Sequence, residues 1–92
     1  MKLRHAAALA MVGWYLMAPP LAATQKEWES FVNLPIGQWD IRQSFDSAEK
    51  CEVVRQQNSD RAFHAGNPVP LSFRPDMMAV CVSTDDPRLK GN

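Results

Sequence analysis

The sequence predicts a small α+β domain, with a two- or three-stranded antiparallel sheet and one main helix, stapled by one disulfide. Two stretches have the apolar patterns of strands, and a capped amphipathic segment between them is typical of a helix. The chain also contains two cysteines. Its 92 residues leave room for one domain of this kind.

Composition places the chain among ordinary globular proteins. Hydrophobic residues make up 46% and charged residues 22%, which excludes wholesale disorder. The formal net charge is zero, whereas a nucleic-acid-binding domain of this size needs a basic surface, so we expect no nucleic-acid partner. Seven prolines and four glycines predict frequent breaks and few long elements.

The N-terminal residues have the pattern of a secretory signal peptide. Lys2 and Arg4 precede an uncharged apolar run, Ala6–Ala18. As a helix that run would be about 20 Å long, against a hydrocarbon core of about 30 Å, which disfavours a permanent span. We therefore expect an exported protein, periplasmic or secreted, that meets the membrane only transiently through this signal segment.

The sequence leaves the cleavage site open. One prediction assigns residues 1–23 to the signal-peptide region, with cleavage after Ala23, and 24–92 to a single small α+β domain. Leu21, at position −3 of that site, is large for a residue there. The alternative is cleavage after Gly13, which would retain Trp14–Pro20 and make Trp14–Met17 a possible third strand. Without that strand we expect a marginal two-stranded ribbon.

The two cysteines, Cys51 and Cys81, are predicted to form a structural disulfide in an oxidising compartment. The bridge would close a loop of about 31 residues and stabilise the fold by about 3.7 kcal/mol in the chain-entropy treatment. Their spacing differs from the C-x-x-C motif of redox-active pairs. Once the leader with His5 is removed, the two cysteines and His64 also offer too few ligands for a zinc site, so we predict no metal.

The segment after Ala23 is ambiguous. Thr24 and Glu27 form a capping-box pattern, and Trp28 and Phe31 follow at helical spacing, which predicts a short helix. An irregular linker is the alternative, since Pro35 prevents the helix from continuing.

Two firmer elements follow. Residues 38–45 alternate as a half-buried strand, with Trp39 and Ile41 on the covered face. A helix is predicted from about Ser47 to Asn58, with Asp46 in the position of a capping residue.

The remaining chain is predicted to contain one more strand. Residues 58–75 have the composition of a loop, and Met77–Ser83 is apolar enough for a buried strand. Residues 88–92 are expected to form a frayed tail.

No residue pattern predicts catalysis. His64 stands alone in a loop-like segment, and Ser72 and Ser83 lack a recognisable base or nucleophile-elbow motif. Asp85 and Asp86 are adjacent carboxylates without calcium-loop spacing, typical of a turn. We therefore predict a protein that is not an enzyme, with no catalytic residue, cofactor or metal.

The predicted function is an exported, disulfide-bonded binding or envelope-associated domain. Most aromatic side chains are needed for the core of so small a domain, and the best candidate for a partner surface is the pair Trp28 and Phe31. The expected partner is an envelope or extracellular protein. A membrane-tethered protein whose N-terminal apolar segment stays uncleaved is the alternative.

Three blocks of the sequence, Trp14–Pro20, Phe45–Glu52 and Cys81–Leu89, are similar to blocks in small exported bacterial proteins of uncharacterised function. The resemblance covers most of the chain in scattered pieces. It implies that Trp14–Pro20 belongs to the mature protein, which strengthens the alternative cleavage after Gly13. It implies no catalytic or binding residue.

Overall fold

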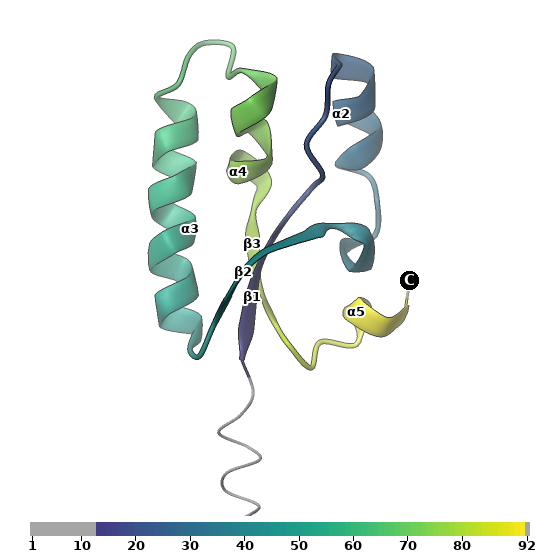
Figure 1. Ribbon diagram of the computed structural model, residues 1–92, viewed down its shortest axis with the longest axis vertical. Coiled ribbons are helices and arrows are strands. Elements are labelled where there is room, and N and C mark those ends of the chain that lie inside the picture. Colours follow the sequence, from purple (N-terminus) through teal and green to yellow (C-terminus); the bar gives the residue numbers. More distant parts are fainter. Residues whose placement is uncertain (1–12, 92) are drawn as a thin grey trace, which may run out of the picture.

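A computed structural model describes residues 13–91 of the protein, and these form a three-stranded antiparallel sheet with helices packed on it (Figure 1). In chain order the elements are β1 (Trp14–Ala18), α2 (Gln25–Phe31), the 3-10 helix η1 (Ile36–Gln38), β2 (Asp40–Phe45), α3 (Ala48–Phe63), the 3-10 helix η2 (Leu71–Phe73), α4 (Arg74–Met78), β3 (Val80–Ser83) and α5 (Arg88–Gly91). The predicted α+β fold class is confirmed.

The first strand of the described chain lies in the middle of the sheet. The strand order is β2-β1-β3, and both neighbours run antiparallel to β1. Leu16 is opposite Gln43 of β2 on one side and opposite Cys81 of β3 on the other. The segment 14–17, which the sequence left either as a discarded signal or as a possible third strand, thus holds the sheet together.

The core lies on both faces of this central strand. On the α3 side the buried cluster contains Leu16, Ala18, Cys51 and Ala79, with Trp14, Phe45, Val54 and Cys81 packed against it. Met17 and Val82 are also buried, and they belong to the opposite face because side chains alternate along a strand. Figure 1 shows α3 on one side of the strands, with α2 and α5 on the other side.

Strand β2 does not bury the residue that the sequence predicted. The register shifts between Leu16, opposite Gln43, and Met17, opposite Ile41, so Arg42 is an extra residue in a bulge. The bulge places Ile41 opposite Met17 and not on the face that carries Leu16. Strand β2 lies at the edge of the sheet, and all of its residues except Phe45 are exposed. Ile41 is 54% exposed, and its predicted burial is wrong.

Trp39 lies just outside β2 and is half-buried. Its indole N–H donates a hydrogen bond of 3.0 Å to the carbonyl oxygen of Leu34. The ring therefore anchors the chain between α2 and the sheet, whereas the prediction placed it on a strand.

The main helix is longer than predicted. Ser47 is its N-cap, and the Ser47 hydroxyl accepts a 3.2 Å hydrogen bond from the Lys50 backbone N–H, in place of the predicted Asp46. The helix continues past Asn58 to Phe63 because tertiary packing supports its last turn, where Ala62 is fully buried.

One helix, α4, contains residues that the sequence placed partly in a loop and partly in a strand. Residues 74–78 form α4, with Pro75 buried at its first turn, where the fixed φ of proline favours a helix start. Met77 and Met78 belong to α4, so the predicted strand Met77–Ser83 shortens to Val80–Ser83. Helix α4 lies beside α3 in Figure 1.

The chain after β3 ends in a short helix, and the expectation of a frayed tail is wrong for the described residues. Helix α5 packs against η1, so closely that a Cβ added at Gly37 would lie 2.8 Å from the carbonyl oxygen of Arg88. The absence of a side chain at Gly37 permits this contact.

The ambiguous segment after Ala23 contains a helix, α2. The Thr24 hydroxyl accepts a 3.1 Å hydrogen bond from the Glu27 backbone N–H. The Glu27 carboxylate in turn accepts a 2.9 Å bond from the backbone N–H of Ala23, which completes a variant of the capping box.

The disulfide between Cys51 and Cys81 is confirmed. It links the first turn of α3 to the second residue of β3, across a Cα–Cα distance of 6.1 Å. Cys51 is completely buried and part of the core cluster.

Residues 1–12, which carry the basic start and much of the predicted signal segment, lie outside the described residues. Among residues 13–91, none of the helices is both long and apolar enough to cross a membrane.

Replacing both cysteines by alanine is expected to destabilise the fold by about 3–4 kcal/mol, because the bridge no longer restricts the unfolded chain. In a domain of this size that loss lowers the thermal unfolding midpoint by more than about 10 °C, measurable by circular dichroism. Reductant should produce a similar shift in the unaltered protein and none in the double-alanine protein. Equal midpoints for the oxidised unaltered protein and the double-alanine protein would contradict a stabilising role of the bridge.

Candidate functional site

The residues weighed for catalysis lie apart from one another. His64 follows the last residue of α3 and is exposed, with Nδ1 of its ring 2.7 Å from the carbonyl oxygen of Asp60. Ser72 lies on η2, and the Ser83 hydroxyl donates to the Asp85 carboxylate. Within residues 13–91, neither serine shares a hydrogen bond with His64, and the structure assembles no nucleophile and base from this set.

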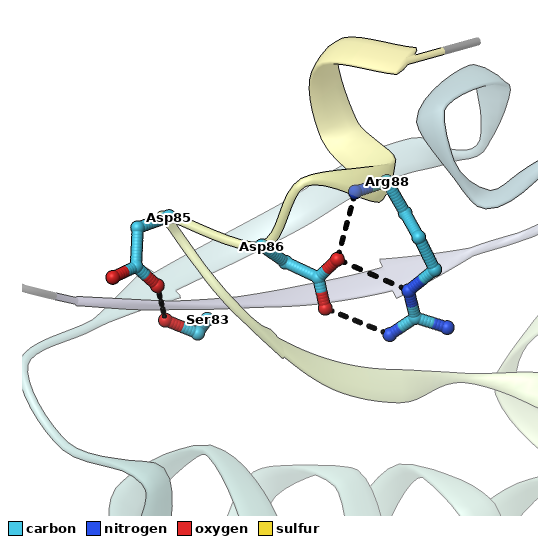
Figure 2. Close-up of polar contacts among 4 residues, drawn as sticks. All are labelled: Ser83, Asp85, Asp86 and Arg88. Atoms are coloured by element: carbon cyan, nitrogen blue, oxygen red, sulfur yellow. Dashed lines mark hydrogen bonds and ion pairs between the residues drawn. The ribbon is translucent and has the colours of Figure 1, made fainter.

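The adjacent carboxylates Asp85 and Asp86 bind groups of their own chain (Figure 2). The Asp86 carboxylate accepts three hydrogen bonds from Arg88: 2.8 Å from the backbone N–H, 3.1 Å from Nε and 2.9 Å from Nη2. Asp85 turns away and accepts from Ser83. No cluster of three or more metal-ligating side chains is present in the described part of the chain. This pair therefore fastens the turn between β3 and α5.

The Arg88 guanidinium holds the pKa of the Asp86 carboxyl below its usual range, first through the side-chain hydrogen bonds and then through the backbone N–H. The same contact raises the pKa of Arg88. Both groups are charged at neutral pH, and the bidentate pairing suits the planar guanidinium.

A surface hollow of about 610 Å³ is the strongest candidate for a binding site. Four elements contribute to it: α2, the end of α3, the loop before η2, and α4. Its lining residues are Trp28, Phe63, Gly66, Asn67, Pro68, Val69, Arg74, Met77 and Met78. Most of them are apolar. Phe63 is 56% exposed and Met78 is 42% exposed, so large apolar side chains face solvent here.

The one charged side chain in this lining is Arg74, and the fold holds it in place. Its Nε donates a 2.8 Å hydrogen bond to the carbonyl oxygen of Val69, and its Nη1 donates to the side-chain oxygen of Gln25. Among residues 13–91 the ion pairs involve other cations, and no carboxylate lies within 4 Å of the Arg74 guanidinium. The hollow thus combines an apolar lining with a fixed positive charge.

The two aromatic residues predicted as a partner surface are not equivalent. Trp28 lines the hollow, whereas Phe31, one turn later on α2, is half-buried and lies outside this lining. Sequence reasoning missed Phe63, Arg74 and Met78, because it placed them in a loop or a strand. Pro75, as the first-turn residue of a helix, was the available signal for α4.

Comparison with protein-family models, with curated proteins and with solved structures finds no match to this chain.

The pairing of Asp86 predicts the direction of a titration. Replacing Arg88 by glutamine should raise the pKa of the Asp86 carboxyl toward its ordinary value, because both side-chain hydrogen bonds and the positive charge are lost. In the unaltered protein the lowered pKa contributes stability above the ordinary carboxyl pKa, and this contribution is lost as pH falls through the folded-state value.

A carboxyl-carbon NMR titration of the two proteins measures this shift. Lys90→Gln, on the same short helix, is the matched control and should leave the titration of Asp86 unchanged. An identical Asp86 titration in the Arg88→Gln variant would show that the ion pair is not formed in solution.

Proposed function

We propose that the protein is an exported, disulfide-bonded domain that acts by binding and not by catalysis. The hollow at Trp28, Phe63 and Met78 binds an apolar segment of a partner protein in the periplasm or outside the cell. The observation that carries the proposal is the exposure of large apolar side chains around one fixed guanidinium.

The disulfide supports the compartment in this proposal. Bridges of this kind persist where the surroundings are oxidising and are rare in a reducing cytosol. Cys51 is buried in the core, so the bridge is part of the packing and not an exposed redox pair. The basic residues Lys2 and Arg4, followed by the apolar run Ala6–Ala18, are a second, independent reason to expect export.

The character of the lining favours a protein ligand. Exposing Phe63 and Met78 to water is unfavourable for the free domain, and covering them on association recovers that free energy. Aromatic residues, methionine and arginine are the types enriched where proteins bind one another, and methionine adapts to ligands of different shape. An open hollow at the surface suits a side chain presented by another chain.

The positive charge of Arg74 favours a ligand that carries a negative charge. A guanidinium without a carboxylate partner in the described structure gains most from an acidic group on the ligand. The proposed ligand is therefore a peptide segment with a bulky apolar residue next to an aspartate, a glutamate or a C-terminal carboxylate. A single cation amid apolar groups does not provide the basic surface that nucleic acid requires.

The alternative function, a membrane-tethered protein, requires residues of β1 to lie in the bilayer. A permanent anchor needs Ala6–Ala18 in the bilayer, whereas the structure has Trp14–Ala18 paired with two strands. These two arrangements exclude each other, and this supports the binding domain over the anchor.

Selection of a displayed library of random peptides on the intact, oxidised protein tests the proposal. We expect enriched peptides to carry a bulky apolar residue beside an acidic one. Phe63→Ser should weaken their binding at least tenfold, which corresponds to about 1.4 kcal/mol. Arg74→Gln should weaken binding of the acidic peptides in particular.

Val53→Ser is the matched control, because Val53 is as exposed as Phe63 on the same helix but lies outside the lining. Its affinity should equal that of the unaltered protein. Peptides that bind Phe63→Ser as tightly as the unaltered protein would contradict the hollow as the binding site.

A further inference from the structure

The central strand β1 lies inside the segment that has the pattern of a signal peptide. We propose that processing of this chain leaves Gly13 and all of β1 on the mature protein, so that no cut falls beyond the Val12–Gly13 bond. This inference concerns where the exported chain begins, and it is independent of the ligand of the hollow.

The strand order carries the argument. Strands β2 and β3 each pair with β1, and they are not neighbours in the sheet. Cleavage after Ala23 would therefore leave two strands with no partner between them, and not the two-stranded ribbon that the sequence suggested. Every ladder hydrogen bond of the described sheet would be lost together.

The core would be lost with the ladder. Residues 14–22 supply four of the eight buried hydrophobic residues in the described part of the chain: Leu16, Met17, Ala18 and Ala22. Leu16 and Ala18 belong to the same buried cluster as Cys51, so cleavage after Ala23 would remove the side chains that pack against the disulfide. A domain of residues 24–92 would keep the Cys51–Cys81 disulfide but lose the core packing around it.

The hydrogen bonds of the Gly13 backbone indicate on which side of this residue the leader is cleaved. Its backbone N–H donates a 3.1 Å hydrogen bond to the Thr84 hydroxyl, and its carbonyl oxygen accepts a 2.9 Å bond from the Thr84 backbone N–H. These bonds join the start of β1 to the end of β3. Cleavage after Gly13 would remove both, whereas cleavage before it leaves an amino group that can still donate to Thr84.

The chemistry is ordinary peptide hydrolysis by a leader peptidase. Water adds across the Val12–Gly13 bond or one upstream, its oxygen becoming part of the leader's new carboxylate. The nitrogen released from the broken C–N bond becomes the amino terminus of the mature chain. The apolar part of such a leader, residues 6–12, is at the short end of the range for signal peptides, and the whole leader is shorter than their usual length of about 15–30 residues.

The full chain of 92 residues, with a C-terminal tag, is expressed in an exporting bacterium, and folded, oxidised protein is recovered from the envelope or medium. Its intact mass fixes the first residue. A chain that begins at Gly13 or upstream, including the uncleaved chain, agrees with the proposal. Folded protein that begins at Trp14 or later overturns it.

A pair of leucine substitutions tests whether the mature protein contains β1 without identifying its first residue. Leu16→Ala keeps the segment apolar for export but removes a core side chain, and should lower the unfolding midpoint of the exported protein by at least about 10 °C. Leu21→Ala makes the same change at a residue that is 63% exposed and should shift the midpoint by less than about 3 °C. Equal midpoints for the two variants would show that the mature protein lacks β1.

Discussion

The pairing of β1 with both of its neighbours is the interaction on which the rest of the structure depends. Each outer strand has its described ladder with β1, so the sheet exists because residues 14–18 lie in its middle. The same residues bury side chains on both faces, since Leu16 faces the α3 side and Met17 the opposite side. A segment of five residues thereby joins all the layers of the fold.

The disulfide acts on this sheet from its edge. The bridge between Cys51 and Cys81 links α3, on one face of the sheet, to the edge strand β3, and it borders the buried cluster that contains Leu16 and Ala18 of β1. In so small a core, the free energy gained by burying apolar groups only slightly exceeds the cost of the conformational entropy lost on folding. Small domains therefore commonly contain a covalent constraint such as a disulfide. The hollow benefits from the same constraint, because Phe63 ends the helix that the bridge anchors at its first turn.

The sequence was informative where local chemistry decides the structure. The Thr24–Glu27 capping box, the start of α3 near Ser47 and the cysteine pair all follow from short-range patterns, and the structure has each of them. The sequence was uninformative where contacts between residues far apart in the chain decide the structure. Nothing local indicates the bulge at Arg42, the exposure of Ile41 on an edge strand, or the burial of Ala62 in the last turn of α3. The sequence pointed to Trp28, which lines the hollow, but not to Phe63 or Arg74, because the lining is assembled from segments far apart in the chain.

The bulge at Arg42 has a consequence for how copies of the protein meet. Strand β2 is an edge strand of the described sheet, and an unpaired edge with an exposed isoleucine invites a second chain to extend the ladder. The irregularity bends this edge, and Asp40 and Arg42 place charges along it. Arg42 is also held toward Asp76 at 3.8 Å. Together these features disfavour the addition of a second chain to the β2 edge of the sheet.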